Sequence, residues 1–252
     1  MLHVQTSLYR IRAVAVAAAC TIMVAMGSAQ AAGDIGATVA AMPDRSDEDK
    51  KMDAHRQPAK LLDFAGIKPG MSVMDLMAGG GYTTELLARA VGKDGKVYAQ
   101  NSPTAPEKAL NAMAERLKKP ALANVVSVSA PADGPFPDVH DVDLVTFVLN
   151  YHDTTFLPID RAKMNKALFD GLKHGGVYLI VDHAAKAGDG ATVGKSLHRI
   201  EESTVVTEVE AAGFKKEAEG NFLRQPGDAK DQPFFKMNDQ PTDQFVLKFK
   251  KP

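Results

Sequence analysis

Residues 73–87 constrain the fold most strongly. In this segment an apolar run ends in Asp75, three glycines follow at 79–81, and an amphipathic helix begins at once. Glycine adopts positive φ and lets a ligand approach the main chain, while the next helix offers unpaired N–H groups at the same place. An acid just before the glycines suits hydroxyl groups or a cationic amine better than a pyrophosphate. The segment therefore predicts a nucleoside-type cofactor, with S-adenosylmethionine as the leading candidate.

The rest of the chain alternates short apolar runs with amphipathic segments. Strands are expected at 71–77, 96–100, 124–129, 143–149, 177–181, 214–218 and 244–250. Helices are expected at 46–57, 59–64, 83–91, 106–118, 159–172 and 201–212, and a long loop at 220–241. This alternation predicts an α/β domain whose largely parallel sheet is covered by helices on both faces. The net charge of −1 comes without a strongly basic block, so no nucleic-acid partner is expected.

The first residues have the pattern of a secretory signal. Arg10 and Arg12 precede a continuously apolar stretch at 13–26, and an A-x-A cleavage site stands at 29–31. The apolar stretch is shorter than the ~20 residues of a spanning helix, although an uncleaved anchor is the alternative. We therefore expect a signal peptide at 1–31 and an exported, periplasmic protein with no stable membrane insertion after cleavage.

The mature chain is expected to have two parts. Residues 32–44 are small and polar and predict a flexible lead-in, and residues 45–252 form the folded domain. The only cysteine, Cys20, lies in the predicted signal peptide, so the mature protein has no disulfide, thiolate nucleophile or cysteine metal site. The sequence does not indicate an oligomeric state.

Polar side chains follow the expected strands at their carboxyl ends. They are Asp75, Asn101, Asn150, His152, Asp153, Asp182 and His183. Ligands of open α/β sheets bind beyond the carboxyl ends of the strands, where the winding reverses. A set of polar residues at one such edge predicts a site, although each one alone also fits an ordinary strand end at the solvent.

A dinucleotide site is the first alternative for the glycine segment. The G-x-G-x-x-G pattern starting at Gly79 would require a glycine where Thr84 stands. A dinucleotide site also needs an acid at the end of the second strand, and this chain has Asn101 there. Hydride transfer with a nicotinamide is therefore disfavoured.

Four motifs in order carry a family resemblance. They are the segment from Asp75 to Gly81, the helix end and strand at 172–180, the Glu-Ala-Ala-Gly-Phe segment at 210–214, and the closing strand before Lys250. With these motifs, residues 45–252 resemble the class I S-adenosylmethionine-dependent methyltransferases, and in particular predicted bacterial members with signal peptides. The resemblance implies an α/β, Rossmann-like, seven-stranded doubly wound sheet in three αβα layers. The implied strand order is 3-2-1-4-5-7-6, with the last strand antiparallel.

The resemblance also implies a cofactor site. Asp75 would accept a hydrogen bond from the amino group of S-adenosylmethionine, and Gly79 and Gly81 would leave room for the cofactor. Asn101 stands where the family usually has an acid that holds the ribose hydroxyls; an amide can still accept one hydrogen bond and donate another.

Three further residues complete the cofactor set. Met77 replaces the first glycine of the usual triplet. Ala130 stands near the place of an adenine-binding acid, for which Asp133 is a substitute. Asn150, at the end of the fourth strand, is expected on the wall of the same site.

Methyl transfer depends mainly on aligning a nucleophile with the methyl group, and a hydroxyl or protonated amine also requires a base. His152 is the expected base, oriented by Asp153 or Asp182, and His183 is the second choice, because histidine titrates near neutral pH. These residues and His198 could also supply metal ligands, but they do not have the compact spacing of a metal-binding motif, so no metal site is predicted. Arg56 and Arg199 are candidates for the acceptor side, with solvated ion pairs as the alternative.

Two functions remain open. The first is an S-adenosylmethionine-dependent methyltransferase acting on an unidentified small molecule or envelope component. The second is a non-catalytic ligand-binding protein on the same scaffold. The second arises because a methyl donor made in the cytoplasm would have to reach an exported enzyme, and because residue 101 is not an acid.

Overall fold

Seven strands form a single sheet in the computed structural model, which describes residues 35–136, 139–237 and 240–252. The strands are β1 (Ser72–Leu76), β2 (Lys96–Asn101), β3 (Val125–Ser129), β4 (Val142–Val148), β5 (Leu172–His183), β6 (Lys215–Gly220) and β7 (Gln244–Lys250). Their order is β3-β2-β1-β4-β5-β7-β6, and β7 runs antiparallel to both β5 and β6. The strand order and the antiparallel last strand predicted from the sequence are confirmed.

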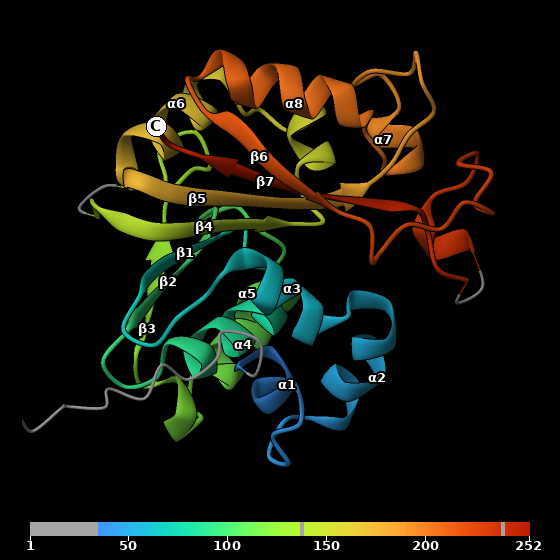
Figure 1. Ribbon diagram of the computed structural model, residues 1–252. Coiled ribbons are helices and arrows are strands. Elements are labelled where there is room, and N and C mark those ends of the chain that lie inside the picture. Colours follow the sequence, from blue (N-terminus) through green and yellow to red (C-terminus); the bar gives the residue numbers. More distant parts are fainter. Residues whose placement is uncertain (1–34, 137–138, 238–239) are drawn as a thin grey trace, which may run out of the picture. The chain divides into compact units, whose positions relative to one another are not determined.

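Helices cover both faces of this sheet (Figure 1). The α-helices are α1 (Ile35–Ala40), α2 (Asp47–Arg56), α3 (Pro58–Ala65), α4 (Tyr82–Val91), α5 (Glu107–Arg116), α6 (Arg161–Gly171), α7 (Gly194–Leu197) and α8 (Glu202–Ala211). Short 3-10 helices are η1 (Pro120–Leu122), η2 (His152–Thr155) and η3 (Phe234–Lys236). Helices α1, α3 and α4 lie on one face and α6 and α8 on the other, which gives the predicted three layers.

The central strands are buried on both sides because their apolar residues are nearly continuous. Side chains of a strand point alternately to opposite faces. Val73 accordingly packs into the core beneath α3 and α4, whereas its neighbour Met74 packs into the core beneath α6 and α8. Leu144 and Val145 of β4 divide in the same way.

The winding of the chain reverses between β1 and β4. From β1 the chain proceeds outward through β2 and β3, then returns to add β4 on the other side of β1. A crevice forms beyond the carboxyl ends of the strands at such a reversal. The segments that follow β1 and β4 are therefore the ones placed to meet a ligand.

The prediction of a flexible lead-in at 32–44 is wrong for the residues from 35 onward. Residues 35–40 form α1, in which Val39 is only 2% exposed and packs in the α3–α4 core. Gly36 makes this docking possible, because a Cβ there would lie 2.2 Å from the backbone oxygen of Ala59. The predicted signal peptide, residues 1–31, lies outside the described residues. None of the helices in the described ranges is long and apolar enough to cross a membrane.

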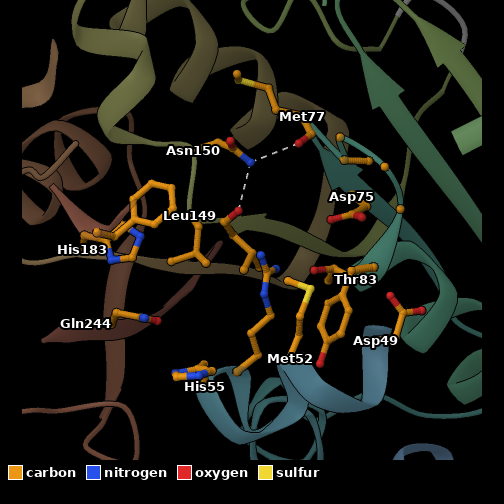
Figure 2. Close-up of a pocket in the computed structure, with 18 of the residues that line it drawn as sticks. Asp49, Met52, His55, Asp75, Met77, Thr83, Leu149, Asn150, His183 and Gln244 are labelled. Atoms are coloured by element: carbon orange, nitrogen blue, oxygen red, sulfur yellow. Dashed lines mark hydrogen bonds between the residues drawn. The ribbon is translucent and has the colours of Figure 1, made fainter. Parts of the chain in front are cut away.

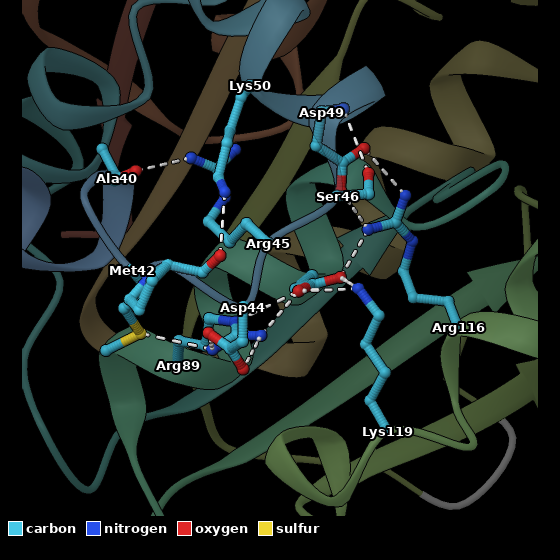
Figure 3. A network of polar contacts seen from close by, with 12 residues as sticks. Ala40, Met42, Asp44, Arg45, Ser46, Asp49, Lys50, Arg89, Arg116 and Lys119 are labelled. Atoms are coloured by element: carbon cyan, nitrogen blue, oxygen red, sulfur yellow. Dashed lines mark hydrogen bonds and ion pairs between the residues drawn. The ribbon is translucent and has the colours of Figure 1, made fainter.

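Ion pairs fix α2 and the segment before it against α4 and α5 (Figure 3). Arg89 pairs with Asp44 at 2.9 Å, and Arg116 pairs with Asp49 at 2.5 Å. Glu85 is fully buried and takes contacts from Lys119 at 2.8 Å as well as from both arginines. Burial opposes ionisation of Glu85, but the three cationic hydrogen bonds outweigh it and lower its pKa. The network holds α2 beside the residues that follow β1.

Candidate functional site

A cavity of about 970 Å³ opens at the carboxyl ends of β1 and β4. Its walls include residues of α2, residues 75–83, the chain at the end of β4, Phe234 and Phe235, and residues 240–242 with Gln244. In Figure 2, Asp49, Met52 and His55 reach it from α2, and His183 and Gln244, at the left of the view, come from β5 and β7. The volume lies at the upper end of the range typical of small-molecule sites, so it can hold a cofactor with a small second ligand.

Asp75 forms part of the cavity floor and is held rigidly. Its carboxylate accepts hydrogen bonds from Thr84 at 2.6 Å and from Thr146 at 2.8 Å. The register of the sheet explains the second bond, because Asp75 and Thr146 are opposite partners on β1 and β4. Burial raises the pKa of Asp75 to about 6, although both hydrogen bonds and the charge of Arg56 oppose the rise.

The glycines after β1 form a bend with two different surroundings, which we call the glycine bend (residues 78–81). Gly79 has φ +57° and no atom within 4 Å of the position of a Cβ, so bare backbone faces open space there. Gly81 has φ +85°, and a Cβ there would lie 2.9 Å from Cδ of Arg116. Gly81 therefore allows α5 to pack against the bend. Gly81 is also part of the cavity wall, so its role in leaving room for a ligand stays a prediction.

Asn101 does not line the cavity, contrary to its expected position at a ribose. Its side-chain oxygen accepts from the N–H of Gly79 at 2.9 Å, and its Nδ2 donates to the carbonyl of the same residue at 3.1 Å. Gln100 adds a second support, because its Oε1 accepts from the N–H of Met77 at 2.8 Å. The end of β2 thus fixes the backbone of the glycine bend.

Asp133 also lies away from the cavity walls. Its carboxylate is 3.6 Å from the Nζ of Lys163. The structure gives this residue a partly exposed ion pair in place of the adenine contact expected from the sequence.

Met77 and Asn150 both line the cavity and are bonded to one another. Nδ2 of Asn150 donates to the carbonyl of Met77 at 3.1 Å and to that of Val148 at 3.0 Å (Figure 2). Met77 has φ +48° and Leu149 has φ +61°. Left-handed conformations of bulky residues are strained and persist only where neighbouring contacts impose them. The chain after β1 and the chain after β4 are therefore locked together at the edge of the cavity.

His152 is not placed as a base for a ligand in the cavity, so this prediction is wrong. Its ring is 2% exposed and is not part of the cavity wall. Nδ1 is 2.7 Å from Asp182, while Nε2 is 3.1 Å from Asp153 and 3.3 Å from His198. Burial opposes protonation, but the charge of Asp182 and hydrogen bonds to both acids raise the pKa of His152 to about 10. It is protonated at neutral pH, and both ring nitrogens have partners.

The local backbone explains this orientation. The chain turns into η2 directly after β4, and the N–H of His152 donates to the carboxylate of Asp182 at 2.7 Å. Asp182 thus acts on the ring and on the main chain of the same residue, and it orients His152 as predicted. Its own carboxylate is fully buried and does not line the cavity.

His183 is the histidine at the end of a strand that does line the cavity. Its Nδ1 is 2.7 Å from the hydroxyl oxygen of Thr242, and its ring stacks on Phe234 with centres 5.0 Å apart. Burial lowers the pKa of His183 to about 4, so the imidazole is neutral at neutral pH. A neutral imidazole that carries its proton on Nδ1 and donates it to Thr242 can accept a proton at Nε2.

Arg56 lines the cavity without an ion-pair partner among the described residues. Its guanidinium lies 4.8 Å from the centre of the Tyr82 ring, and burial lowers its pKa. Arg199 differs: it is fully buried, pairs with Asp228 at 2.8 Å, and anchors the loop after β6. Of the two arginines suggested for the acceptor side, Arg56 alone reaches the cavity.

Sequence reasoning missed the aromatic wall of the cavity. Phe234 and Phe235 are 46% and 60% exposed and come from η3, inside the segment predicted as a long loop. No periodic pattern marked them. The only signal in the sequence was a pair of adjacent aromatic residues between two prolines, and it does not predict where their side chains point.

Comparison with known proteins agrees with this architecture. The sequence pattern of the family described as protein-L-isoaspartate(D-aspartate) O-methyltransferase matches residues 40–147. The ubiquinone/menaquinone biosynthesis C-methyltransferase UbiE of Shewanella sediminis is 30% identical over 155 residues, which are 60% of this chain and 59% of the relative. The chain therefore spans about three-fifths of the length of the curated relatives it matches.

Solved structures share the fold at lower identity. A methyltransferase from Aquifex aeolicus that depends on S-adenosylmethionine has a TM-score of 0.57 at 22% identity, over 80% of this chain and 96% of that one. Fibrillarin of Aeropyrum pernix, solved with natively bound S-adenosyl-L-methionine, has a TM-score of 0.50 at 13% identity, over 73% and 67% of the two chains. The chain has the class I S-adenosylmethionine-dependent methyltransferase fold.

Proposed function

We propose that the protein is an S-adenosylmethionine-dependent methyltransferase that acts on an unidentified small molecule or envelope component. The observation that carries the proposal is the bare backbone at Gly79, which faces a cavity of about 970 Å³ at the reversal point of a methyltransferase fold. The match to a methyltransferase family over residues 40–147 and the relative bound to S-adenosyl-L-methionine support the same cofactor.

The residues of the cavity fit the charged end of this cofactor. Asp75 and Arg56 both line it, one an acid and the other a cation without an ion pair in the described ranges. An acid and a cation on one cavity suit the amino and carboxylate groups of an amino acid. When bound, S-adenosylmethionine supplies an electrophilic methyl group that is transferred to a nucleophile as the bond from carbon to sulfur breaks.

His183 takes the role that the sequence assigned first to His152. The neutral imidazole is on the cavity wall, and Thr242 fixes its ring through Nδ1. We infer that Nε2 accepts the proton released by a hydroxyl or amine acceptor. General bases of this kind contribute typically 10²–10⁴-fold to a rate.

The acceptor is expected to be largely apolar. Met52, Phe234 and Phe235 line the cavity and are 36%, 46% and 60% exposed. Exposed aromatic side chains at a cavity provide stacking surface for a planar or lipophilic molecule. We further propose that the protein is exported to the periplasm, from the signal pattern at 1–31, with no nucleic-acid partner and no stable membrane insertion after cleavage.

A ligand-binding protein without catalysis is the second candidate. It is favoured by Asn101, which is an amide and is bonded to Gly79 on both polar atoms. In this case the cavity would bind a nucleoside-type ligand, but no methyl group would be transferred.

Calorimetry of the purified protein with S-adenosylmethionine tests the cofactor, and mass spectrometry of ligands that co-purify tests the acceptor. We expect saturable binding with one cofactor per chain. Absence of heat up to millimolar ligand would contradict both the cofactor site and the enzyme. Binding without release of S-adenosylhomocysteine in the presence of envelope extract would support the second candidate.

A further inference from the structure

A cluster of two histidines and two acids lies next to the cavity but outside its walls. We call it the histidine cluster: His152 and Asp153 from η2, His198 after α7, and Asp182 at the end of β5. Neither the fold nor the proposed methyl transfer uses these residues together. The positions of these residues along the chain do not show the compact spacing typical of metal ligands, and only the fold brings them together.

Three atoms of the histidine cluster converge on one point. Nε2 of His152 is 3.1 Å from a carboxylate oxygen of Asp153 and 3.3 Å from Nδ1 of His198, and the last two atoms are 3.6 Å apart. Ligands about 2.1 Å from a tetrahedral metal ion are separated by roughly 3.4 Å. The triangle therefore has the size that an ion bound to all three atoms requires.

Asp182 orients the most buried ligand. Its carboxylate lies 2.7 Å from Nδ1 of His152 and also accepts from the N–H of that residue at 2.7 Å. A carboxylate on the far nitrogen of a metal-binding histidine fixes the tautomer and turns the other nitrogen toward the metal. This supporting bond lies within the protein, where both side chains are at most 2% exposed.

The fold brings His198 to this place through two special backbone positions. Gly194 of α7 packs so closely on η2 that a Cβ would meet the carbonyl oxygen of His152 at 2.8 Å. His198 itself has φ +52°, a left-handed conformation that is uncommon for a residue other than glycine. Strained backbone of this kind is frequent at functional sites.

The surroundings suit a bound ion that is accessible from one side. The side chains of His198 and Asp153 are 29% and 23% exposed, so an entry path exists. Rings of Phe156, Phe234 and Phe235 lie 5.9, 6.1 and 5.3 Å from the ring of His198. An apolar shell limits the access of water to a metal site.

We propose that His152, Asp153 and His198 bind a divalent transition-metal ion, with zinc as the best match, and that Asp182 positions His152. Binding of the ion displaces the proton from Nε2 of His152 to the solvent. Two imidazoles and one carboxylate are ligands that zinc accepts, and three protein ligands leave one tetrahedral position open. The ring of His183 on the cavity wall is centred 6.0 Å from that of His152. The ion would therefore lie one side chain behind the wall that we assign to the acceptor.

Zinc titration of the chelator-treated, full-length protein tests the site, with magnesium as the comparison ion. We expect one zinc per chain by calorimetry and metal analysis, a higher melting temperature with zinc, and no comparable effect of magnesium, which prefers oxygen ligands. Absence of zinc binding would overturn the proposal, and the cluster would then be a buried imidazolium held between two acids.

Two variants locate the bound ion. His198→Ala removes a partly exposed ligand, leaves the bond between His152 and Asp182 intact, and is expected to weaken zinc binding by at least about 100-fold. His174→Ala is the control, because His174 is exposed and lies at the start of β5, whereas Asp182 lies at the end of that strand. This variant should bind zinc as the parent protein does. Equal zinc affinity in parent and His198→Ala would contradict the assignment. Circular dichroism of each variant checks its fold, and neither result depends on cofactor binding.

Discussion

The glycine bend and the histidine cluster lie at the same edge of the sheet but use their polar groups in opposite ways. Around the bend, Asp75, Asn101 and Asn150 are bonded to the protein frame, and bare backbone is left facing the cavity. In the cluster, the side chains of His152 and His198 face each other and two acids. The first arrangement provides room for an organic ligand, and the second provides a point for a single ion.

This difference changes how strand ends should be interpreted. The rule that ligands bind beyond the carboxyl ends of parallel strands correctly locates the polar residues at one edge. It does not determine which of them share a cavity. That depends on the first turn after each strand, and the turn at η2 directs His152 away from the space that His183 faces.

The largest effect is expected from a variant that blocks the glycine bend and leaves the histidine cluster unchanged. Gly79→Val should weaken S-adenosylmethionine binding by at least about 100-fold, because a branched side chain would occupy the open space above the bend and is strained at φ +57°. Zinc binding should be unchanged. Calorimetry with each ligand measures both effects.

Gly70→Val is the matched control for the backbone strain. Gly70 has φ +82° and no atom within 4 Å of a Cβ, but it is not on the cavity wall. The control should lose stability without losing cofactor affinity. Full cofactor affinity in Gly79→Val would show that the ligand binds elsewhere.

The second-largest expected effect tests which histidine acts as the general base in the cavity. His183→Ala should slow the release of S-adenosylhomocysteine by about 100-fold while cofactor affinity changes little, because a base contributes to the transfer step rather than to binding. At saturating cofactor, the parent rate should be constant from pH 6 to pH 8, since burial lowers the pKa of His183 to about 4 and the imidazole is already neutral. A rate that rises through pH 9 toward the pKa of about 10 of His152 would instead restore that residue as the base.

Much of this architecture could be predicted from the sequence. Apolar runs and glycine stops predicted where the strands lie, because burial on both faces of a parallel strand leaves a continuous apolar pattern. The strand order was implied by the family resemblance. Side-chain direction could not be predicted in the same way. Asn101 has an amide that can bind a ribose or a backbone, and only the position of Gly79 across the sheet decides between them. Phe234 reaches the cavity from a segment whose sequence has no hydrophobic periodicity, so its position could not be predicted.

Arg56→Gln tests the cationic side of the cavity. Loss of a charge-assisted hydrogen bond of about 1.5–3 kcal/mol should reduce cofactor affinity roughly 10- to 100-fold. Lys51→Gln is the control, since Lys51 is an exposed cation on the same helix, α2. Equal losses in both variants would indicate a general effect of charge rather than a specific contact.

The pH dependence of cofactor binding tests Asp75. Burial raises its pKa to about 6, so the carboxylate that would accept from a cationic amine is mostly ionised at pH 7.5 and mostly protonated at pH 5. We expect affinity to fall about tenfold across that interval as the pH is lowered. Asp75→Asn should bind weakly at both pH values and lose the dependence. A parent affinity that is flat with pH would mean that the ionised carboxylate does not contact the cofactor.

The smallest expected effect distinguishes two roles for Asn101. If this residue held a ribose, Asn101→Asp would restore the acid that methyltransferases of this fold usually have and would strengthen binding. The contacts with Gly79 predict the opposite, because the new carboxylate oxygen would face the carbonyl of Gly79, which now accepts from Nδ2 at 3.1 Å. Two acceptors at that distance repel each other, so the bend should shift and affinity should fall several-fold. Calorimetry of Asn101→Asp and Asn101→Ala shows whether cofactor affinity rises or falls. Tighter binding by the aspartate variant than by the parent would establish the ribose contact. Weaker binding by the aspartate variant than by the alanine variant would establish that Asn101 holds the backbone of Gly79.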